Sequence, residues 1–329
     1  MAAIITLLSL SNSLLAYISD RRYARQVTDT KINPPPLFVL GHWRTGTTLL
    51  HELLVKDDRF SFPTTFQCMT PHHFLWSDRW LSSRLDWLMP SRRPMDDMAI
   101  GMNRPQEDEF ALVNLGLGSP YLEWAFPNRR QCYDAYLTLH SLSDDERANW
   151  KSQFERFVKQ LYLLNPKRVV LKSPTHTARI RTLLEIFPDA RFVHIVRNPL
   201  QSIPSTVRTW TRVCDAISLQ VRREPVTVDR ILDVFEVMYH RFDSDCGLIP
   251  PDRIVEIRYE DLVANPLPQL QGIYSSLGLD DFEYAQPAIS TYLASTANYK
   301  PNNLQITDDV KEKIRTRCGK YMSKYGYQP

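Results

Sequence analysis

Short apolar runs, each followed by a stretch with helical periodicity, constrain the fold of this chain more than any other feature. The runs cover residues 37–40, 169–171, 192–196 and 254–257. Strands as apolar as these are typical of a parallel sheet that is covered on both faces, and strands that alternate with helices are typical of three-layer α/β proteins. Such sheets bind their ligands at the carboxyl ends of the strands. The sequence therefore predicts an α/β fold whose site residues directly follow the apolar runs.

Length and composition narrow the class of protein. The 329 residues suffice for about two domains, or for one large α/β domain with an insertion. A content of 43% hydrophobic residues excludes an intrinsically disordered chain, and the near balance of 40 Lys and Arg against 37 Asp and Glu excludes a protein that coats nucleic acid. The five cysteines are scattered and form no C-x-x-C pair. This spacing disfavours a zinc site or a disulfide framework and predicts a reducing, cytoplasmic location.

Residues 57–167 separate the first strand–helix unit from the second. Such a stretch is too long for a structureless loop, and Ser143 with Glu146 has the pattern of a capping box that begins a helix. We therefore expect a mainly helical insertion. The expected organisation is an N-terminal helix and linker over residues 1–33 and one large domain over residues 34–329.

Helix signals also follow the later strands. Ser173 and Pro174 predict the N-cap and the first residue of one helix, and Asn198 and Pro199 predict those of another. A third helix is expected over residues 262–277. These signals place a helix after each of the last three apolar runs.

The N-terminal segment is apolar up to Ile18 and is then basic, with Arg21, Arg22 and Arg25. Residues 1–18 include several polar side chains and fall short of the roughly 20 apolar residues that are needed to span a bilayer. No basic residue precedes this stretch, as one would in a signal peptide. Two interpretations stay open: an amphipathic helix that docks on the large domain, or peripheral contact with a membrane through residues 1–25. The expected apolar face consists of Leu7, Leu8, Leu14, Leu15 and Ile18.

The first strand-to-helix turn has the form of a phosphate-binding loop. Gly41 and Gly46 have the spacing G-x-x-x-x-G, and backbone N–H groups at the start of a helix can hold an anion. Thr47, however, stands where a nucleotide triphosphatase has its lysine, and the cation of the loop is Arg44. The third strand ends in Arg197, where a metal site would need a carboxylate. The pattern predicts an anionic, nucleotide-like ligand that is bound without a metal.

Three motifs follow one another in the chain. The loop Arg44-Thr45-Gly46-Thr47-Thr48 comes first, Lys172 ends the second strand, and Arg197 ends the third strand with Ser205 eight residues later. This order resembles the sulfotransferases that use 3′-phosphoadenosine 5′-phosphosulfate (PAPS). In that family a loop of the form [R/K]-[S/T]-G-T-T binds the 5′-phosphosulfate, and the arginine and serine bind the 3′-phosphate. The resemblance covers most of residues 35–327 and implies a P-loop-like sulfotransferase fold.

The resemblance also implies a chemistry. A sulfuryl group would pass from PAPS to an acceptor hydroxyl or amine by in-line displacement, without a metal ion and with release of adenosine 3′,5′-bisphosphate (PAP). Arg44 would stabilise the charge that grows on the leaving phosphate, and Lys172 would hold the sulfuryl oxygens, because fixed cations stabilise developing charge. Lys300 would add a further cation to the donor site.

Four residues are candidates for the base that takes the proton of the acceptor. His176 is expected in the first turn of a helix, whose dipole favours a neutral ring, although cytosolic members of the family have their histidine where this chain has Pro174. Glu107 and Asp108 belong to an acidic run that resembles a segment of bacterial relatives, and Glu107 is expected to be partly buried. His51 is expected on a solvated helix face. The sequence leaves the choice among these residues open.

Two other functions also stay open. A Mg²⁺-dependent nucleotide kinase or NTPase would share the strand–loop–helix unit but would need a basic residue at Thr47. A non-catalytic anion-binding protein or membrane adaptor would keep the loop and tolerate the loss of Lys172. The acceptor, a small molecule, carbohydrate or lipid and not a nucleic acid, is expected to contact residues 57–167. Trp43 is expected either to stack on adenine or to line a wall against this insertion.

Overall fold

The computed structural model describes residues 2–86, 101–296 and 306–328, with side chains from residue 9 onward. Within these residues, parallel strands form one sheet in the order β2-β3-β1-β4-β5. The α/β fold with a parallel sheet is thus confirmed, and β2 is an edge strand too short to leave a sequence signal. The strands are β1 (Leu37–Leu40), β2 (Phe60–Ser61), β3 (Arg168–Lys172), β4 (Arg191–Val196) and β5 (Ile254–Arg258).

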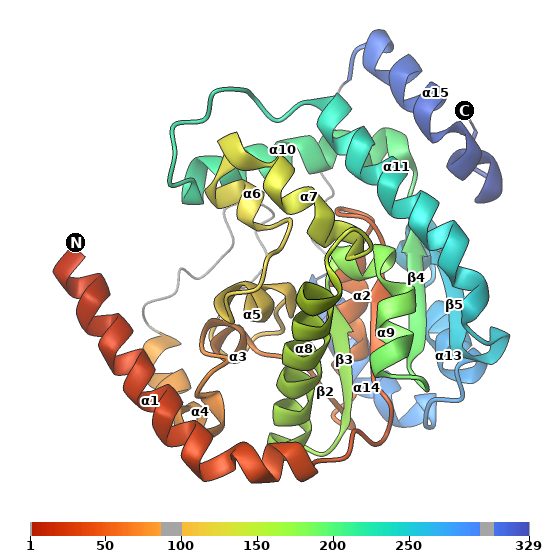
Figure 1. Cartoon of the computed structure of the whole chain (residues 1–329). Coiled ribbons are helices and arrows are strands. Elements are labelled where there is room, and N and C mark those ends of the chain that lie inside the picture. The colour runs from red at the N-terminus through yellow and green to blue at the C-terminus, as the bar shows by residue number, and fades with distance from the viewer. Residues whose placement is uncertain (1, 87–100, 297–305, 329) are drawn as a thin grey trace.

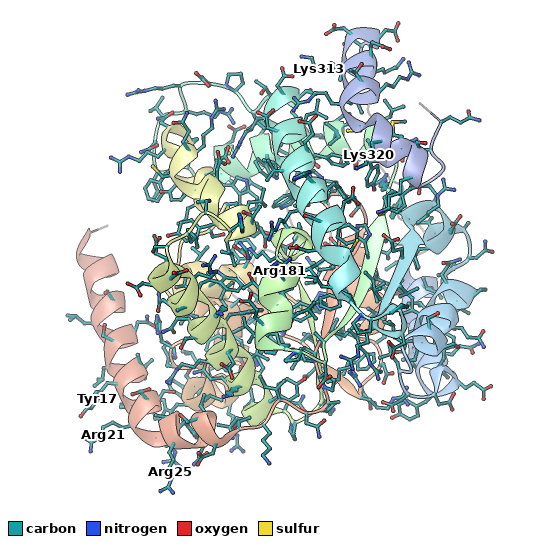
Figure 2. All side chains as sticks on the ribbon, turned by 45° about the vertical axis from the view of Figure 1, so that its right-hand side comes forward. Tyr17, Arg21, Arg25, Arg181, Lys313 and Lys320 are labelled. Atoms are coloured by element: carbon teal, nitrogen blue, oxygen red, sulfur yellow. The ribbon has the colours of Figure 1, made fainter. Side chains whose placement is uncertain are left out.

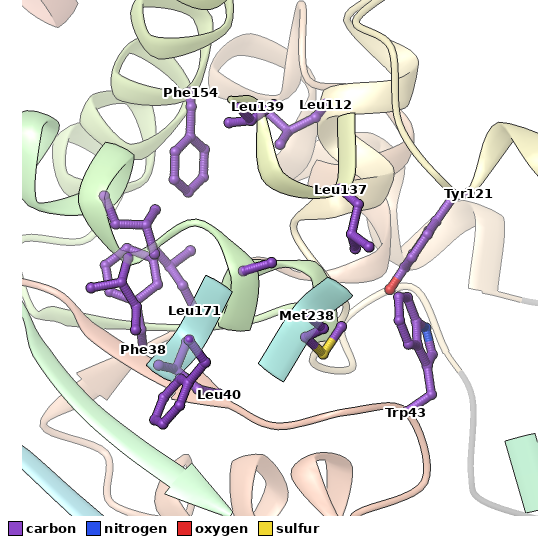
Figure 3. Packing of buried hydrophobic residues seen from close by; sticks show 14 of the residues in the cluster. Phe38, Leu40, Trp43, Leu112, Tyr121, Leu137, Leu139, Phe154, Leu171 and Met238 are labelled. Carbon is purple, nitrogen blue, oxygen red and sulfur yellow. The ribbon is translucent and has the colours of Figure 1, made fainter. Parts of the chain in front are cut away.

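Helices cover both faces of the sheet (Figure 1). Alternate residues of β1 point to opposite faces, so that Phe38 and Leu40 join one buried cluster and Leu37 and Val39 join another. Phe38 packs near Phe154 of α8 in the first cluster, with ring centroids 6.4 Å apart (Figure 3). The first cluster includes residues of α8 (Asp144–Leu164), α10 (Pro199–Ile217), α11 (Val228–Asp245) and α15 (Asp308–Lys324), and the second includes residues of α2 (Thr47–Leu54), α13 (Pro266–Ser276) and α14 (Phe282–Thr296).

The insertion between β2 and β3 is mainly helical where the structure describes it, as expected. Its long last helix, α8, begins with a capping box in which Ser143 Oγ accepts a hydrogen bond from Glu146 N at 3.3 Å and Glu146 Oε2 accepts one from Ser143 N at 3.0 Å. The shorter helices of the insertion are α3 (Thr65–Met69), α4 (Phe74–Leu85), α5 (Glu109–Asn114), α6 (Leu122–Ala125), η2 (Pro127–Arg129) and α7 (Gln131–Thr138).

The helix after β3 differs from its prediction. The chain first forms a 3-10 helix, η3 (Pro174–Ala178), and α9 (Ile180–Ile186) begins only beyond it. Ser173 does not cap η3 with its side chain. Its hydroxyl instead accepts a hydrogen bond from the backbone N–H of Glu109 at 3.0 Å, so a tertiary contact has replaced the local cap.

The helix expected over residues 262–277 is two helices, α12 (Tyr259–Ala264) and α13. Pro266 explains the break, because proline has no N–H group and is favoured at the first position of a new helix. The helix predicted after Asn198 is confirmed as α10, and Asn198 Oδ1 accepts a hydrogen bond from Leu200 N at 2.9 Å. Two short 3-10 helices, η4 (Cys246–Leu248) and η5 (Pro251–Arg253), precede β5.

The N-terminal helix, α1 (Ala2–Asp29), lies across α4 and α8 (Figure 1). Polar contacts hold it there. Asn12 Oδ1 lies 2.6 Å from His73 Nε2, and Asp20 pairs with Arg156 of α8 at 2.6 Å. The docking side of α1 is therefore defined by these polar contacts together with Val27, which is buried in the first cluster.

The apolar face expected for α1 is only partly the face that docks. Leu15 and Ile18 are half-buried, but Leu14 is 60% exposed, and the side chains of Leu7 and Leu8 lie outside the described residues. The prediction is wrong for Leu14: the contacts of Asn12 and Asp20 and the burial of Val27 in the first cluster place another side of the helix against the domain. Among the described residues, no helix combines the length and the apolar character needed to cross a membrane.

Candidate active site

The phosphate-binding loop connects β1 to α2 at the carboxyl edge of the sheet, and its two glycines have backbone angles that favour glycine. Gly41 has φ +150°, and a Cβ there would lie 2.6 Å from the carbonyl oxygen of Ile195. Gly46 has φ +99°, and a Cβ there would overlap the ring of Tyr259. Both positions require a residue without a side chain. The loop is thus packed closely between β4 and the start of α12.

Three of the residues predicted to bind the donor lie together. Arg44 has φ +67°, an uncommon conformation for a residue other than glycine, and its Nε donates a hydrogen bond to Ser205 Oγ at 3.1 Å. Arg197 Nη1 donates to the carbonyl oxygen of Arg44 at 3.0 Å. The guanidinium of Arg197 lies 4.1 Å from the centre of the Tyr259 ring. Two cations and a hydroxyl therefore adjoin the loop, a set that suits a phosphorylated ligand.

Thr45, Gly46, Thr47 and Thr48 complete the predicted donor loop, and the structure gives them different surroundings. The Thr45 hydroxyl donates inward to the carbonyl oxygen of His42 at 2.7 Å. Gly46 is the N-cap of α2, and Thr47 and Thr48 form its first turn, where free backbone N–H groups favour an anion. Lys300 lies outside the described residues.

Lys172 and Glu107 meet beside this loop. The Nζ atom of Lys172 lies 2.6 Å from Glu107 Oε1 and 3.4 Å from Thr48 Oγ1. The other carboxylate oxygen of Glu107 accepts a hydrogen bond from the Tyr121 hydroxyl. The Lys172 side chain is 3% exposed and that of Glu107 is 16% exposed. A cation and a carboxylate are thus held at the edge of the site with limited access to water.

The two carboxylates that follow Glu107 point into the interior. Asp108 accepts a hydrogen bond from Ser173 Oγ at 3.1 Å, and its Oδ2 lies 2.5 Å from His176 Nε2. Glu109 forms a bidentate pair with Arg179 at 2.6 and 3.0 Å. Burial would raise the pKa of both carboxyl groups, but the neighbouring charges and hydrogen bonds outweigh it and lower both pKa values. These pairs hold the segment that precedes α5, which includes Glu107, against the turn after Lys172.

Three of the four base candidates are enclosed. His176 is 0% exposed, and its ring lies 5.4 Å from the rings of both Phe38 and Phe154. Asp108 is equally buried, and His51 is buried in α2 rather than solvated as expected. A base must reach the proton of an acceptor within hydrogen-bond distance. The partly exposed Glu107 is therefore the one candidate that adjoins Lys172 and the loop.

Trp43 lies in the core beside the insertion. Its side chain is 6% exposed, and its ring stands perpendicular to that of Trp210 at 5.2 Å. Figure 3 shows it beside Tyr121 of the insertion, 6.3 Å between ring centres. The ring lines the wall against the insertion, as one of the two interpretations expects, and stacking on adenine stays a prediction.

Sequence reasoning missed two tyrosines that adjoin the site. Tyr121 gives no signal, because nothing in its local sequence indicates that its hydroxyl reaches Glu107. Tyr259 follows β5 directly, a position at which site residues are expected in a parallel sheet. Among the described residues, no group of three or more His, Cys, Asp and Glu side chains is arranged to hold a metal ion.

Comparisons with known proteins match this chain to sulfotransferases. A family model described as "Sulfotransferase family" matches residues 35–284. Two curated proteins named "Omega-hydroxy-beta-dihydromenaquinone-9 sulfotransferase Stf3", from Mycobacterium bovis and Mycobacterium tuberculosis, are each 42% identical to this chain over 326 residues, which cover 99% of this chain and 84% of theirs.

Solved structures resemble the fold. Sulfotransferase STF9 from Mycobacterium avium matches with a TM-score of 0.72 and 20% identity over 95% of this chain and 81% of its own. Sulfotransferase STF1 from Mycobacterium tuberculosis matches with a TM-score of 0.63 and 22% identity over 92% of this chain and 81% of its own. At such low identity these structures show a common fold and nothing more.

Proposed function

This chain belongs to the sulfotransferase family and is an enzyme of that class, and from that premise we propose that it transfers the sulfuryl group of PAPS to a lipid hydroxyl by in-line displacement without a metal ion. The observation that carries the proposal is the contact of Lys172 with both Glu107 and Thr48. This contact places a cation and a carboxylate next to a loop that suits a phosphorylated ligand.

The residues around the loop fit the donor. The first turn of α2, from Thr47, offers backbone N–H groups to the 5′-phosphosulfate, and Arg44 neutralises the charge that grows on the leaving 5′-phosphate. Arg197 and Ser205 hold the 3′-phosphate through a charged and a neutral hydrogen bond. Lys300 remains part of this proposal as a further cation.

Glu107 acts as the general base in this proposal. Its carboxylate takes the proton of the acceptor hydroxyl while the acceptor oxygen bonds to sulfur. The bond between sulfur and the bridging oxygen breaks, and PAP leaves with the electron pair. Lys172 turns from Glu107 towards the sulfuryl oxygens when the donor binds, which frees Glu107 to accept the proton. Tyr121 keeps its hydrogen bond to the other carboxylate oxygen and holds the base in place.

The proposed acceptor is a lipid that carries a hydroxyl group, of the prenylated quinone class. This choice rests on the two relatives, whose names describe sulfotransferases of a hydroxylated menaquinone and which are 42% identical over 99% of this chain. Residues 57–167 supply Glu107 and Tyr121 to the site, so we propose that the same insertion contacts the acceptor.

A thermal-shift titration tests the donor. PAP and ATP are each added with and without Mg²⁺. We expect PAP to stabilise the protein with no need for Mg²⁺, by about 2.7 kcal/mol at 100 times its dissociation constant. Stabilisation by ATP with Mg²⁺ and not by PAP would instead favour the nucleotide kinase class.

An acceptor assay with PAPS tests the rest of the proposal. A menaquinone hydroxylated on its prenyl chain is compared with the same quinone without the hydroxyl group and with simple sugars. We expect sulfated product only from the hydroxylated quinone. Sulfation of the sugars alone would contradict the lipid acceptor while leaving PAPS as the donor.

A further inference from the structure

The outward face of α1 combines apolar and basic side chains in one stripe. Leu10, Leu14, Tyr17, Arg21 and Arg25 are spaced by three or four residues, which places them on one side of a helix. Leu10 is 63% exposed, Leu14 60% and Tyr17 58%, and the Arg25 side chain is 95% exposed. Single exposed apolar residues are ordinary on protein surfaces, but adjacent ones that form a stripe indicate a binding surface.

The order of side chains along this stripe has a direction. The apolar residues come first, and the arginines follow towards the end of the helix that leads into β1. In Figure 2, Tyr17, Arg21 and Arg25 point away from the body of the protein along α1. The Arg21 Nη1 atom donates a hydrogen bond to the Tyr17 hydroxyl at 2.9 Å, so the tyrosine marks the boundary between the apolar and the basic part.

The basic end of α1, residues 20–29, carries a net positive charge. Asp20 is engaged by Arg156 of α8 at 2.6 Å, and Asp29 lies 3.8 Å from Arg25. Arg21 and Arg22 add two further exposed positive charges. Residues 2–19 contain no charged residue, so the apolar part of the helix carries no charge that would oppose entry into a lipid headgroup layer.

The middle of α1 does not pack closely against the rest of the protein. A hollow of about 260 Å³ lies between α1 and α8, and Ala16, Tyr17 and Asp20 line it from the α1 side. The side-chain contacts of Asn12 with His73, and of Asp20 with Arg156 at the hollow itself, hold this part of α1 against the domain. The domain therefore holds α1 in a defined rotation that leaves the stripe exposed, with Tyr17 bordering the hollow and still more than half exposed.

We propose that the stripe Leu10, Leu14, Tyr17, Arg21 and Arg25 docks the enzyme on an anionic lipid surface. A helix lies in a membrane interface when one face is apolar, and basic residues beside it attract anionic headgroups. Tyrosine is favoured at that depth because one end of its ring is apolar and the other is polar. The inference goes beyond the proposed function and rests on it only in that a lipid acceptor would be met at such a surface.

Vesicle co-sedimentation of the full chain tests the proposal, with phosphatidylcholine vesicles that do or do not contain phosphatidylglycerol. We expect binding to the anionic vesicles that weakens at high salt. The variant Arg21→Gln/Arg25→Gln should bind them about 25-fold more weakly, about fivefold for each arginine. The variant Leu10→Ser/Leu14→Ser should bind at least about tenfold more weakly.

The matched control is Lys313→Gln/Lys320→Gln, which removes the same charge from α15, far from α1 in Figure 2. We expect its binding to stay within twofold of the wild type. An equal loss in this control, or no binding of the wild type, overturns the proposal. So does sedimentation of the wild type as a dimer that Leu10→Ser/Leu14→Ser dissociates, with no vesicle binding, because the stripe would then be a subunit interface.

The vesicle assay is independent of the proposed function. It contains neither donor nor acceptor, and stabilisation of each variant by PAP in a thermal shift shows that the donor site is intact. Loss of vesicle binding with PAP binding retained therefore tests α1 alone. Loss of the PAP response with vesicle binding retained would contradict the proposed donor and leave the lipid surface in place.

Discussion

Lys172 Nζ and Glu107 Oε1 lie 2.6 Å apart, although the two residues are 65 positions apart in the sequence. One ends a central strand, and the other precedes a short helix of the insertion. The pair closes one side of the phosphate-binding loop, since Lys172 also reaches Thr48 of α2.

Replacement of Lys172 should abolish turnover without abolishing donor binding. In Lys172→Met the cation beside the transferred group is lost, and we expect kcat to fall by about 100-fold or more. Steady-state kinetics with PAPS and a PAP titration measure the two effects. Lys151→Met, at an ion pair on the surface of α8, is the matched control and should leave both values unchanged. Unchanged turnover in Lys172→Met would remove Lys172 from the mechanism.

Glu107 and His176 should differ in what their loss affects. Glu107→Gln keeps the shape of the side chain but removes the base, so kcat per folded molecule should fall by about 100-fold or more, together with some loss of stability because buried Lys172 loses its carboxylate partner. His176→Ala leaves the carboxylate of Asp108 buried without its partner and should cost about 3–5 kcal/mol of stability. Its turnover per folded molecule should stay within a few-fold. The opposite pattern would make His176 the base.

Arg197 should act mainly on donor affinity. Arg197→Ala removes the guanidinium that spans the carbonyl of Arg44 and the Tyr259 ring. We expect the dissociation constant of PAP to rise about 10- to 100-fold, since hydrogen bonds to charged groups contribute about 1.5–3 kcal/mol. Calorimetric titration measures it. Arg84→Ala, an exposed arginine of α4, should bind PAP as the wild type does, and equal affinity in both variants would contradict the assignment.

Gly46 should tolerate no side chain. Gly46→Ala places a Cβ against the Tyr259 ring at φ +99°, and we expect a loss of about 1–3 kcal/mol together with weaker PAP binding. Chemical denaturation and PAP titration measure these losses. Gly272→Ala is the control, because that glycine lies within α13 with open space around it, and alanine is favoured in helices. It should be neutral or stabilising by up to about 1 kcal/mol.

Stability should fall in acid because of Glu109. Its pKa is lowered in the folded protein, since the Arg179 charge and hydrogen bonds outweigh burial. The pair therefore stabilises the fold fully above the ordinary value of about 4.3, and this contribution is lost as the pH falls through the folded pKa. Denaturation at several pH values should show a slope of up to about 1.4 kcal/mol per pH unit from this group.

A comparison of two variants isolates this slope. Glu109→Gln removes the ionisable group and should flatten the acid limb relative to the wild type, besides lowering stability at neutral pH. Glu283→Gln, at an exposed position of α14, should keep the wild-type slope. Identical acid limbs in all three proteins would show that Glu109 does not determine the acid sensitivity.

Much of the fold could be predicted from the sequence because its signals are local. The strand residues 37–40 are an uninterrupted apolar run, and Asn198 with Pro199 marks a helix start within two residues. The donor-loop residues are likewise contiguous from Arg44 to Thr48. The break between α12 and α13 was not predicted, because the helical pattern continues across Pro266. The edge strand β2 was not predicted, because it is only two residues long.

The candidate site was only partly predictable. Glu107 and His176 were equal candidates for the base, because a sequence pattern does not show which side chain faces an opening and which is enclosed. The structure separates them: Glu107 adjoins Lys172, whereas His176 lies between the rings of Phe38 and Phe154. Tyr121 could not be proposed at all, because its contact with Glu107 depends on how the insertion folds over the loop.

The sequence by itself determined the four longer strands, the helix that begins after Asn198, and the positions of Arg44 in the loop after β1 and of Lys172 and Arg197 at the ends of β3 and β4. These properties follow from hydrophobic periodicity and from backbone preferences within a few residues. Tertiary structure decided the partners of Glu107, the burial of His176 and the outward rotation of Leu14 on α1. The physical reason is that burial and electrostatic environment are set by segments distant in the chain, whose packing no local pattern contains.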